Sequence, residues 1–422
     1  MKKILLAFLL LIGPLSLPAQ QILRESIAEN PDRAAGDLHV YETFNTSVTP
    51  PPAGFEPFYI SHYGRHGSRY HTSNSLTDKP VKKFAQAEEE GVLTEDGKQL
   101  LSVLRQLQGE HEGMNGFLTQ EGAKQHQGIA ERMISAYPQV FYHSDRPIVY
   151  AVSSPAGRCI QSMANFCTVI KGRAPQIDIQ YYAGDRYMDY ICHPFDIAYM
   201  HDRKHAICDS ILRADLPYER LYEKTFTDPK RGRKILGSRM YFKSVFDALC
   251  IAQDLDADIA PLLSSYFTLD ELTACNRSDN ARYFATWCIS EEFGDTYVQG
   301  VGGPLLRDFI EKADQALAGN GHAADLRFGH DSGLTPLLAL IGVEGFHVRH
   351  EAQAGDDWPV WKYMCMASNL QMVFFRNKDG YVLVKLLRNE SETTIPALPA
   401  VTGPYYLWED LRTYLLSRIA SR

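Results

Sequence analysis

Three times along this chain, a short apolar segment runs directly into a polar turn that is followed by a helical pattern. The apolar segments are residues 58–63, 148–152 and 326–328. Short apolar runs that end in turn residues are typical of buried strands, and strands that alternate with helices are typical of a largely parallel sheet. The sequence therefore predicts an α/β fold, a three-layer αβα sandwich, in which ligands bind at the carboxyl ends of the strands.

Further elements are expected around this sheet. Apolar residues three and four positions apart predict helices over 79–89 and 96–107, and a third helix that Thr119 caps. Two apolar runs on either side of 377–380 predict a hairpin that completes the edge of the sheet.

The second and third polar turns also carry signals for the start of a helix. After the second strand, Ser154 is expected to be the N-cap and Pro155 the first helical residue. After the third strand, Thr335 and Pro336 are expected to open an apolar helix. Each predicted strand would then lead through a short loop into a helix.

The segment 182–297 differs from the rest of the chain. It is richer in tyrosine, aspartate, arginine and cysteine, and it shows helical patterns without a clear strand. We interpret it as a mainly helical cap domain that is inserted into the core. The α/β core would then be built from residues 20–181 and 298–422.

The first 19 residues have the pattern of a secretory signal peptide: two lysines, an apolar run and a small residue at Ala19. We expect cleavage after Ala19 and a periplasmic or secreted protein without a membrane anchor. Export permits disulfide bonds, and the eight cysteines form an even set, although some of them would also suit buried thiols. No CxxC pair is present, which argues against a structural zinc site.

The overall charge limits the kind of partner. The formal net charge is -8, with a sequence pI near 6.0, whereas proteins that bind nucleic acid or anionic membranes usually carry a basic surface. Yet residues 62–71, HYGRHGSRYH, contain three histidines and two arginines. We therefore expect this cluster to serve a small molecule, and no nucleic-acid partner.

Cationic and imidazole side chains follow all three predicted strands. If the sheet brings these strand ends together, they form a pocket for a dianion, because arginine donates paired hydrogen bonds to phosphate and stays charged. A phosphate monoester is the expected ligand. The residues are Arg65, His66 and Arg69 after the first strand, Arg158 after the second, and His330 with Asp331 after the third.

Two of these residues are suited to catalysis. A neutral imidazole at His66 would attack phosphorus in line, while the guanidinium groups stabilise the charge on the other oxygens. Asp331 would donate a proton to the leaving group and later activate water. This scheme requires no metal or other cofactor.

The motifs resemble those of a known family. RHGSR at 65–69 is similar to the RHGxR signature of the histidine acid phosphatases, GHD at 329–331 is similar to their HD motif, and SSPAGRCIQS is similar to the helix that carries their third arginine. The resemblance implies that Arg65, Arg69, Arg158 and His330 bind phosphate, that His66 is phosphorylated and that Asp331 is the proton donor. It also implies a phosphomonoesterase that acts on inositol polyphosphates such as phytate, or on sugar phosphates, and the signal peptide implies that this enzyme is exported.

Some assignments stay open at this point. Lys79 and His71 are possible further substrate contacts, although an exposed lysine is usually solvated and a histidine in a loop usually packs. A non-catalytic receptor for phosphorylated ligands would use the same arginines. A metal-dependent phosphohydrolase would instead use the histidines as metal ligands. The sequence does not predict an oligomeric state.

Overall fold

The computed structural model describes residues 16–42, 48–142, 147–194, 201–237, 239–255 and 262–419. Its centre is an eight-stranded mixed sheet with the order β3-β2-β4-β1-β5-β6-β7, and β8 pairs with β6. The strands are β1 (Glu56–Arg65), β2 (Ile148–Ser153), β3 (Asp178–Ala183), β4 (Ala324–Gly329), β5 (Asn369–Arg376), β6 (Val382–Arg388), β7 (Ser391–Thr393) and β8 (Tyr405–Leu407).

The three strands predicted from their apolar segments are neighbours in this sheet. β4 lies between β1 and β2 and is parallel to both, and β3 extends the parallel part beyond β2. The predicted hairpin forms β5 and β6, which continue the sheet on the other side of β1 as antiparallel strands. Because β1, β2 and β4 are parallel, the polar turns that follow them meet at one edge of the sheet.

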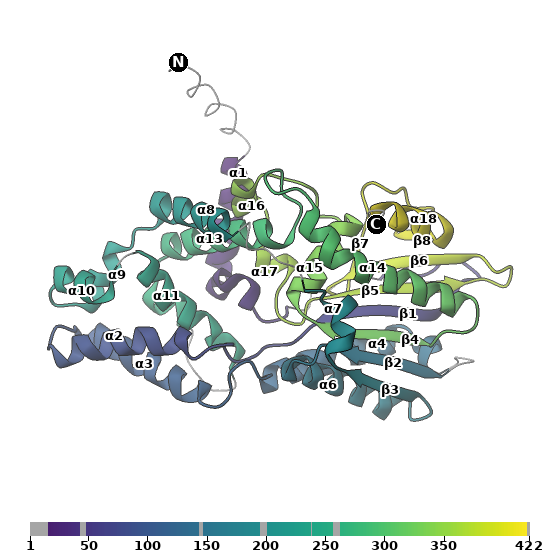
Figure 1. Ribbon diagram of the computed structural model, residues 1–422, viewed down its shortest axis with the longest axis horizontal. Helices are drawn as coiled ribbons and strands as arrows, with labels where there is room; N and C mark the ends of the chain where they lie inside the picture. Colours follow the sequence, from purple (N-terminus) through teal and green to yellow (C-terminus); the bar gives the residue numbers. More distant parts are fainter. Residues whose placement is uncertain are drawn as a thin grey trace, which may run out of the picture.

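Helices cover both faces of the sheet, as the alternation of strands with helices in the sequence predicted (Figure 1). On β1, Ile60 belongs to a hydrophobic cluster with α4 (Gln120–Ala136), α5 (Pro138–Tyr142) and α6 (Gly157–Arg173). Its neighbour Tyr59 belongs to the opposite cluster, with α14 (Thr296–Leu317), α15 (Asp331–Ile341) and α18 (Trp408–Arg418). Successive side chains of a strand point to opposite faces, so one strand fills both layers. The predicted three-layer α/β sandwich is confirmed.

Most of the remaining helices form a third hydrophobic cluster beside the sheet, at the left of Figure 1. Apolar side chains of the N-terminal helices, of α2 and α3, and of the helices within 201–287 pack together there, for example Leu23, Phe84, Leu104, Phe246 and Leu272. The helical part thus draws on more of the chain than the insertion predicted over 182–297. Its elements are α1 (Ser16–Glu29), η1 (Pro31–Leu38), α2 (Ser75–Glu89), α3 (Glu95–His111), α8 (His201–Asp215), α9 (Glu219–Thr225), α10 (Pro229–Leu236), α11 (Arg239–Cys250), η4 (Ile251–Asp254), α12 (Leu263–Tyr266) and α13 (Leu269–Trp287).

Short helices connect the two parts. The polypeptide leaves β3 through η2 and α7, and it returns to the sheet in α14. Between α15 and β5, two short helices contact the helical part: α16 packs against α13, and α17 packs against η1. These short elements are η2 (Asp185–Tyr187), α7 (Met188–Ile191), α16 (Glu351–Asp357) and α17 (Val360–Tyr363).

The predicted helix starts are partly confirmed. Thr119 is the N-cap of α4, and its side chain accepts a hydrogen bond from the Gly122 N–H. α6, in contrast, begins at Gly157 with Ala156 as N-cap, so Ser154 lies before the helix. α15 begins at Asp331, so the prediction that Thr335 and Pro336 open this helix is wrong, and Pro336 lies inside it. The GHD motif therefore lies at the very start of a helix.

The cysteines correct one expectation. All eight lie among the described residues and are free thiols, so the disulfide bonds that export would permit are absent from the structure. Seven of the eight are buried, and Cys167 and Cys288 each pack within a hydrophobic cluster. Cysteine behaves there as a small apolar side chain, which is why an even number did not indicate pairing.

The expected signal peptide, 1–19, lies mostly outside the described residues; from Ser16 onward the chain is part of α1. Among the helices within the described ranges, none combines the length and the apolar character needed to cross a membrane.

Candidate active site

The three predicted turns meet as the sheet requires. Arg65 is opposite Gly329 in the β1–β4 pair, and the Ser154 N–H donates to the Phe328 carbonyl, 2.9 Å away. The side chains then come together across the strands: Arg158 Nη2 lies 3.3 Å from His330 Nδ1, and Arg65 Nη2 lies 3.3 Å from Asp331 Oδ2. The rings of His66 and His330 are 5.8 Å apart. All six predicted site residues thus belong to one cluster, although their roles stay predictions.

The loop after β1 is held by the first turns of α4. A Cβ atom on Gly67 would lie 2.5 Å from the Gly122 carbonyl oxygen, so only glycine allows this close approach. Gln125 of α4 accepts a hydrogen bond from the Ser68 N–H at 2.9 Å, and the Ser68 carbonyl accepts one from the Thr119 N–H at 3.0 Å. The helix therefore fixes the loop backbone from which the arginines and His66 project.

His66 has the geometry and the charge state of a nucleophile. Its Nδ1 lies 2.9 Å from the Gly67 carbonyl oxygen, which can only accept, so Nδ1 carries the hydrogen and Nε2 keeps its lone pair. Burial lowers the pKa of His66 well below its ordinary value, and the nearby arginines lower it further. The imidazole is therefore neutral near pH 7, and its free lone pair is available for attack on phosphorus.

The three arginines carry donors without an acceptor. The Nε atoms of Arg65, Arg69 and Arg158 are buried and find no hydrogen-bond partner among the described residues. Burial, together with the charges of Arg65 and Arg158, lowers the pKa of Arg69 to about 10. Leaving buried donors unpaired beside like charges is unfavourable, so the arrangement favours a bound anion that neutralises them.

His330 orients Arg158. The guanidinium can only donate, so His330 Nδ1 is the acceptor and Nε2 carries the hydrogen that Ser154 Oγ accepts at 2.9 Å. Burial and the positive charge of Arg158 lower the pKa of His330 to about 4. Ser154 is a site residue that the sequence interpretation missed, because its position in front of a helix was read as a helix cap.

Asp331 begins α15, and its carboxylate is held from two sides. Oδ1 accepts a hydrogen bond from the Ser332 N–H at 2.8 Å, and Oδ2 pairs with Arg65. Burial alone would raise the pKa of this carboxyl group, but Arg65 and His330 outweigh it and hold the pKa below its ordinary value. Near pH 7 Asp331 is therefore ionised.

A second carboxylate, that of Asp37, lies against the same guanidinium nitrogen of Arg65, at 3.3 Å. Asp37 belongs to η1, far from the motifs in sequence, and no sequence signal pointed to it.

A cavity of about 390 Å³ opens beside this cluster. Arg69 lines it from the sheet side, and residues of the helical part line it from the other side: Asp37 of η1 and residues of α8, α11 and α13, among them Lys243 and Arg282. His71 also lies in its wall, where it is buried and stacks on the ring of His111. The sheet edge and the helical part thus form one binding cavity.

The two possible further contacts differ in position. Burial, with the charge of His111 added to it, lowers the pKa of His71 to about 3, so this side chain meets the cavity as a neutral ring. Lys79 is exposed on α2 and does not line the cavity. Contact of either residue with a substrate stays a prediction.

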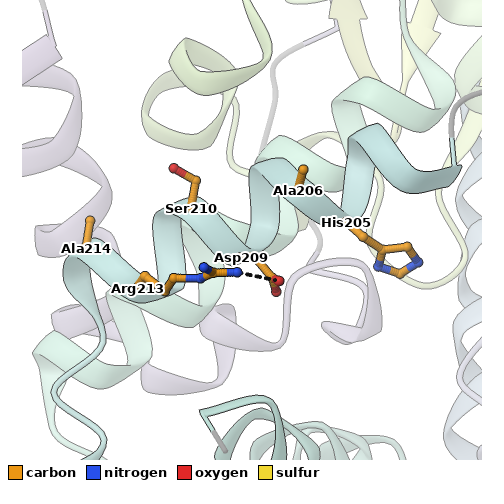
Figure 2. Close-up of a pocket in the computed structure, with 6 residues that line it drawn as sticks. All are labelled: His205, Ala206, Asp209, Ser210, Arg213 and Ala214. Atoms are coloured by element: carbon orange, nitrogen blue, oxygen red, sulfur yellow. Dashed lines mark hydrogen bonds and ion pairs between the residues drawn. The ribbon is translucent and has the colours of Figure 1, made fainter.

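A second hollow, of about 700 Å³, lies on the surface of α8 (Figure 2). The side chains drawn there all come from that one helix, and Arg213 donates a hydrogen bond to Asp209 at 3.1 Å. None of the predicted site residues lies in this hollow, so we place the candidate site at the sheet edge. Within the described ranges, no three histidine, cysteine, aspartate or glutamate side chains gather in a way that suits a metal ion.

No protein-family model matches this sequence, and no curated protein matches it. Solved structures do match. The multiple inositol polyphosphate phosphatase of Bifidobacterium longum, in complex with phosphate, has a TM-score of 0.75 at 18% identity, over 91% of this chain and 97% of that one. The phytase from D. castellii has a TM-score of 0.66 at 14% identity, over 95% of this chain and 86% of that one. The Hafnia alvei phytase in complex with tartrate has a TM-score of 0.55 at 12% identity, over 88% of this chain and 98% of that one.

These structures define the class of fold. The chain has the fold of these solved structures, an α/β sheet with a helical part. The structures that it is similar to are a multiple inositol polyphosphate phosphatase and phytases.

Proposed function

We propose that this protein is a phosphomonoesterase that works through a phosphohistidine at His66. The observation that carries the proposal is the neutral imidazole of His66, whose Nε2 lone pair is free, within a ring of buried arginine donors that lack an acceptor. A phosphate monoester fits this arrangement because its oxygens supply the missing acceptors. A receptor that merely binds phosphate would not need a deprotonated imidazole at the centre.

The first step transfers the phosphoryl group to the enzyme. Nε2 of His66 forms a bond to phosphorus while the ester P–O bond breaks, and Arg65, Arg69 and Arg158 stabilise the charge on the three other oxygens. Asp331 gives its proton to the departing alkoxide. Because Arg65 depresses the pKa of Asp331, a phosphate that neutralises Arg65 raises that pKa and helps the carboxyl group to hold its proton.

The second step releases phosphate. The Asp331 carboxylate, now deprotonated, accepts a proton from water, whose oxygen bonds to phosphorus as the N–P bond breaks. The products are inorganic phosphate and free His66, and Asp331 is protonated again for the next cycle. Activity is expected to be highest in acid, because Asp331 must carry a proton in the first step.

The substrate class follows from the cavity and from the relatives. The structural relatives include an inositol polyphosphate phosphatase and phytases, and one of them was solved with inositol hexasulfate. In this chain, Lys243 and Arg282 in the cavity wall offer cations to further phosphate groups, and Asp247 and Asp279 offer acceptors to hydroxyl groups. We propose inositol polyphosphates such as phytate as substrates, with sugar phosphates as the alternative. The predicted signal peptide supports action in the periplasm or outside the cell.

A phosphate-release assay with phytate, glucose 1-phosphate and an aryl phosphate tests the proposal. His66→Ala should lower kcat to below about one thousandth for every substrate, because the nucleophile is lost. The control is His350→Ala, which removes an exposed histidine that pairs with glutamates outside the site and should retain activity.

Other outcomes separate the alternatives. Full activity of His66→Ala would end the phosphohistidine mechanism. Loss of wild-type activity with a chelator would point to a metal-dependent hydrolase, whereas saturable phosphate binding without turnover would point to a receptor.

A further inference from the structure

Most of the hydrogen-bond donors of Arg65 are already in use, so few are left for a substrate. A guanidinium group has five N–H donors. Nη1 of Arg65 donates to the backbone carbonyls of Asp37 and Met364, at 2.7 and 2.9 Å. Nη2 donates to Asp37 Oδ2 at 3.3 Å and pairs with Asp331 Oδ2 at 3.3 Å. Among the described residues, Nε alone has no partner, so a phosphate that takes two donors from Arg65 must displace a carboxylate from Nη2.

The two carboxylates are held differently. Asp331 is tied to the first turn of α15 by the Ser332 N–H, and the positive end of a helix stabilises a negative charge there. Asp37 comes from the opposite side and lines the cavity through which a substrate would enter. Asp37 is therefore the carboxylate that an incoming phosphate meets.

The backbone fixes Asp37 in this place. Gly36, directly before it, has a φ of 64°, and a Cβ atom there would lie 2.9 Å from Val360 Cγ1. The carbonyl of Ala34 accepts a hydrogen bond from Asn276 Nδ2 at 3.2 Å, and the carbonyl of Asp32 accepts one from Gln253 Nε2 at 3.1 Å. Helices of the helical part therefore hold the segment that directs the Asp37 carboxylate at Arg65.

We propose that, before substrate binds, the Asp37 carboxylate occupies the place on Arg65 that a substrate phosphate takes, and that protonation of Asp37 releases this place. This inference rests on the proposed function, because it concerns the same phosphate site. Asp37 then acts as an internal competitor whose strength depends on pH. It is a positioning residue for Arg65, and it takes no part in the chemical step.

The surroundings of Asp37 support a proton on this group when phosphate binds. Burial raises the pKa of Asp37 above its ordinary value, Arg65 opposes the rise, and the carboxylate of Asp331 adds to it. A phosphate dianion brings further negative charge and raises the pKa again, so that binding takes up a proton. The charged or titratable groups that face Asp37 are Arg65, Arg69, Arg282, Asp254, Tyr283 and Asp331.

The sign of the effect follows from this linkage. Below the pKa of Asp37 the carboxyl group is neutral and can donate its proton to a phosphate oxygen. Above that pKa the carboxylate repels the phosphate and holds Nη2 of Arg65. Phosphate should therefore bind more tightly in acid, beyond any effect of its own titration.

The test uses inorganic phosphate as a competitive inhibitor of wild type and of Asp37→Asn, between about pH 4 and pH 8. Asparagine has nearly the shape of the protonated carboxyl group and no charge. At pH 7 the inhibition constant of phosphate should be about tenfold lower for Asp37→Asn than for wild type, and the two should converge in acid.

A second readout measures the proton itself. Calorimetric titration with phosphate near pH 6, in two buffers with different ionisation enthalpies, gives the number of protons taken up on binding. Wild type should take up more than Asp37→Asn, by up to about one proton.

The matched control is Asp32→Asn. Asp32 lies in the same η1 segment, and burial raises its pKa as well, but its carboxylate has no contact with Arg65. This variant should follow wild type in both measurements. Asp37→Ser provides a second neutral side chain if Asp37→Asn folds poorly.

Weaker phosphate binding by both neutral variants at every pH, or pH profiles equal to that of wild type, would overturn the inference. In either case a wild type that hydrolyses phosphate esters and depends on His66 leaves the proposed function intact. A wild type without such activity would remove both.

Discussion

The sheet edge and the helical part line one cavity, but their cations differ in whether a carboxylate pairs with them. At the sheet edge, Arg69 and Arg158 are crowded beside Arg65 and keep buried donors without partners. In the helical part, Lys243 pairs with Asp247 and with Asp279, the latter at 2.9 Å, and Arg282 lies 3.6 Å from Asp279. The cations at the sheet edge thus need a bound anion to neutralise them. The cations that α11 and α13 contribute to the cavity, which we call the helical wall, are already compensated by carboxylates.

This difference suits the sheet edge to the chemical step and the helical wall to the recognition of the substrate. Unpaired cations gain most when a phosphate develops charge in the transition state, because nothing else neutralises them. Compensated cations gain less, since a ligand must first compete with their carboxylates. Substitutions at the sheet edge should therefore affect turnover, and substitutions in the helical wall should affect the choice of substrate.

Among the substitutions that test this contrast, the largest effect is expected for Arg158→Ala. Removal of this guanidinium takes away a donor to the phosphoryl oxygens and leaves His330 Nδ1 without its partner. We expect kcat/KM to fall by about 100-fold to 1000-fold for every phosphate ester. Phosphate release measured with phytate and with an aryl phosphate checks this, and Arg158→Lys should recover part of the loss. A loss of less than about tenfold would contradict the view that the uncompensated arginines drive turnover.

Asp331→Asn should have a large effect that depends on the leaving group. Phytate and glucose 1-phosphate release poor leaving groups that need a proton, so kcat should fall by about 100-fold or more. An aryl phosphate leaves more easily and should lose much less. The wild-type rate should also decline as the pH rises above the pKa of Asp331 in the complex. This decline should be absent from the pH–rate profile of the variant. Equal losses for both classes of substrate would contradict the role of Asp331 as proton donor.

The same comparison shows what the sequence could predict. The sheet edge was predicted from local patterns, since each apolar segment, its turn and its charged residues are contiguous. Parallel pairing then placed Arg65, Arg158 and His330 together without further information. The confirmed fold and the correct grouping of the motif residues have this common origin.

The parts that were missed depend on contacts between distant segments. Asp37 reaches Arg65 because helices of the helical part hold its backbone, and no pattern around residue 37 records that contact. Helical periodicity predicted α2 and α3 but not their partner, so the sequence placed them with the core although they pack with the helices within 201–287. Ser154 was read as a helix cap because local rules do not include a bond to His330.

Two glycine substitutions, one at the sheet edge and one in the helical part, should change the free energy of unfolding differently. Gly67→Ala would place a methyl group 2.5 Å from the Gly122 carbonyl, and both partners are backbone that cannot move aside cheaply. We expect the free energy of unfolding to fall by about 1 to 3 kcal/mol. Gly109→Ala, on α3, meets nothing within 4 Å and should leave stability unchanged or raise it by up to about 1 kcal/mol. Urea unfolding measures both values, and equal stabilities would contradict the tight packing of the RHG loop on α4.

The smallest effect is expected for Arg282→Gln in the helical wall. Arg282 lines the cavity beside Asp279, so its charge is already partly compensated. For phytate we expect KM to rise by about threefold to fivefold with kcat unchanged, and for an aryl phosphate we expect no change. The measurement is a comparison of KM and kcat for the two substrates in wild type and variant. If Arg282→Gln lowered turnover of both substrates as strongly as Arg158→Ala, the helical wall would share in the chemistry, and the contrast between the two regions would be lost.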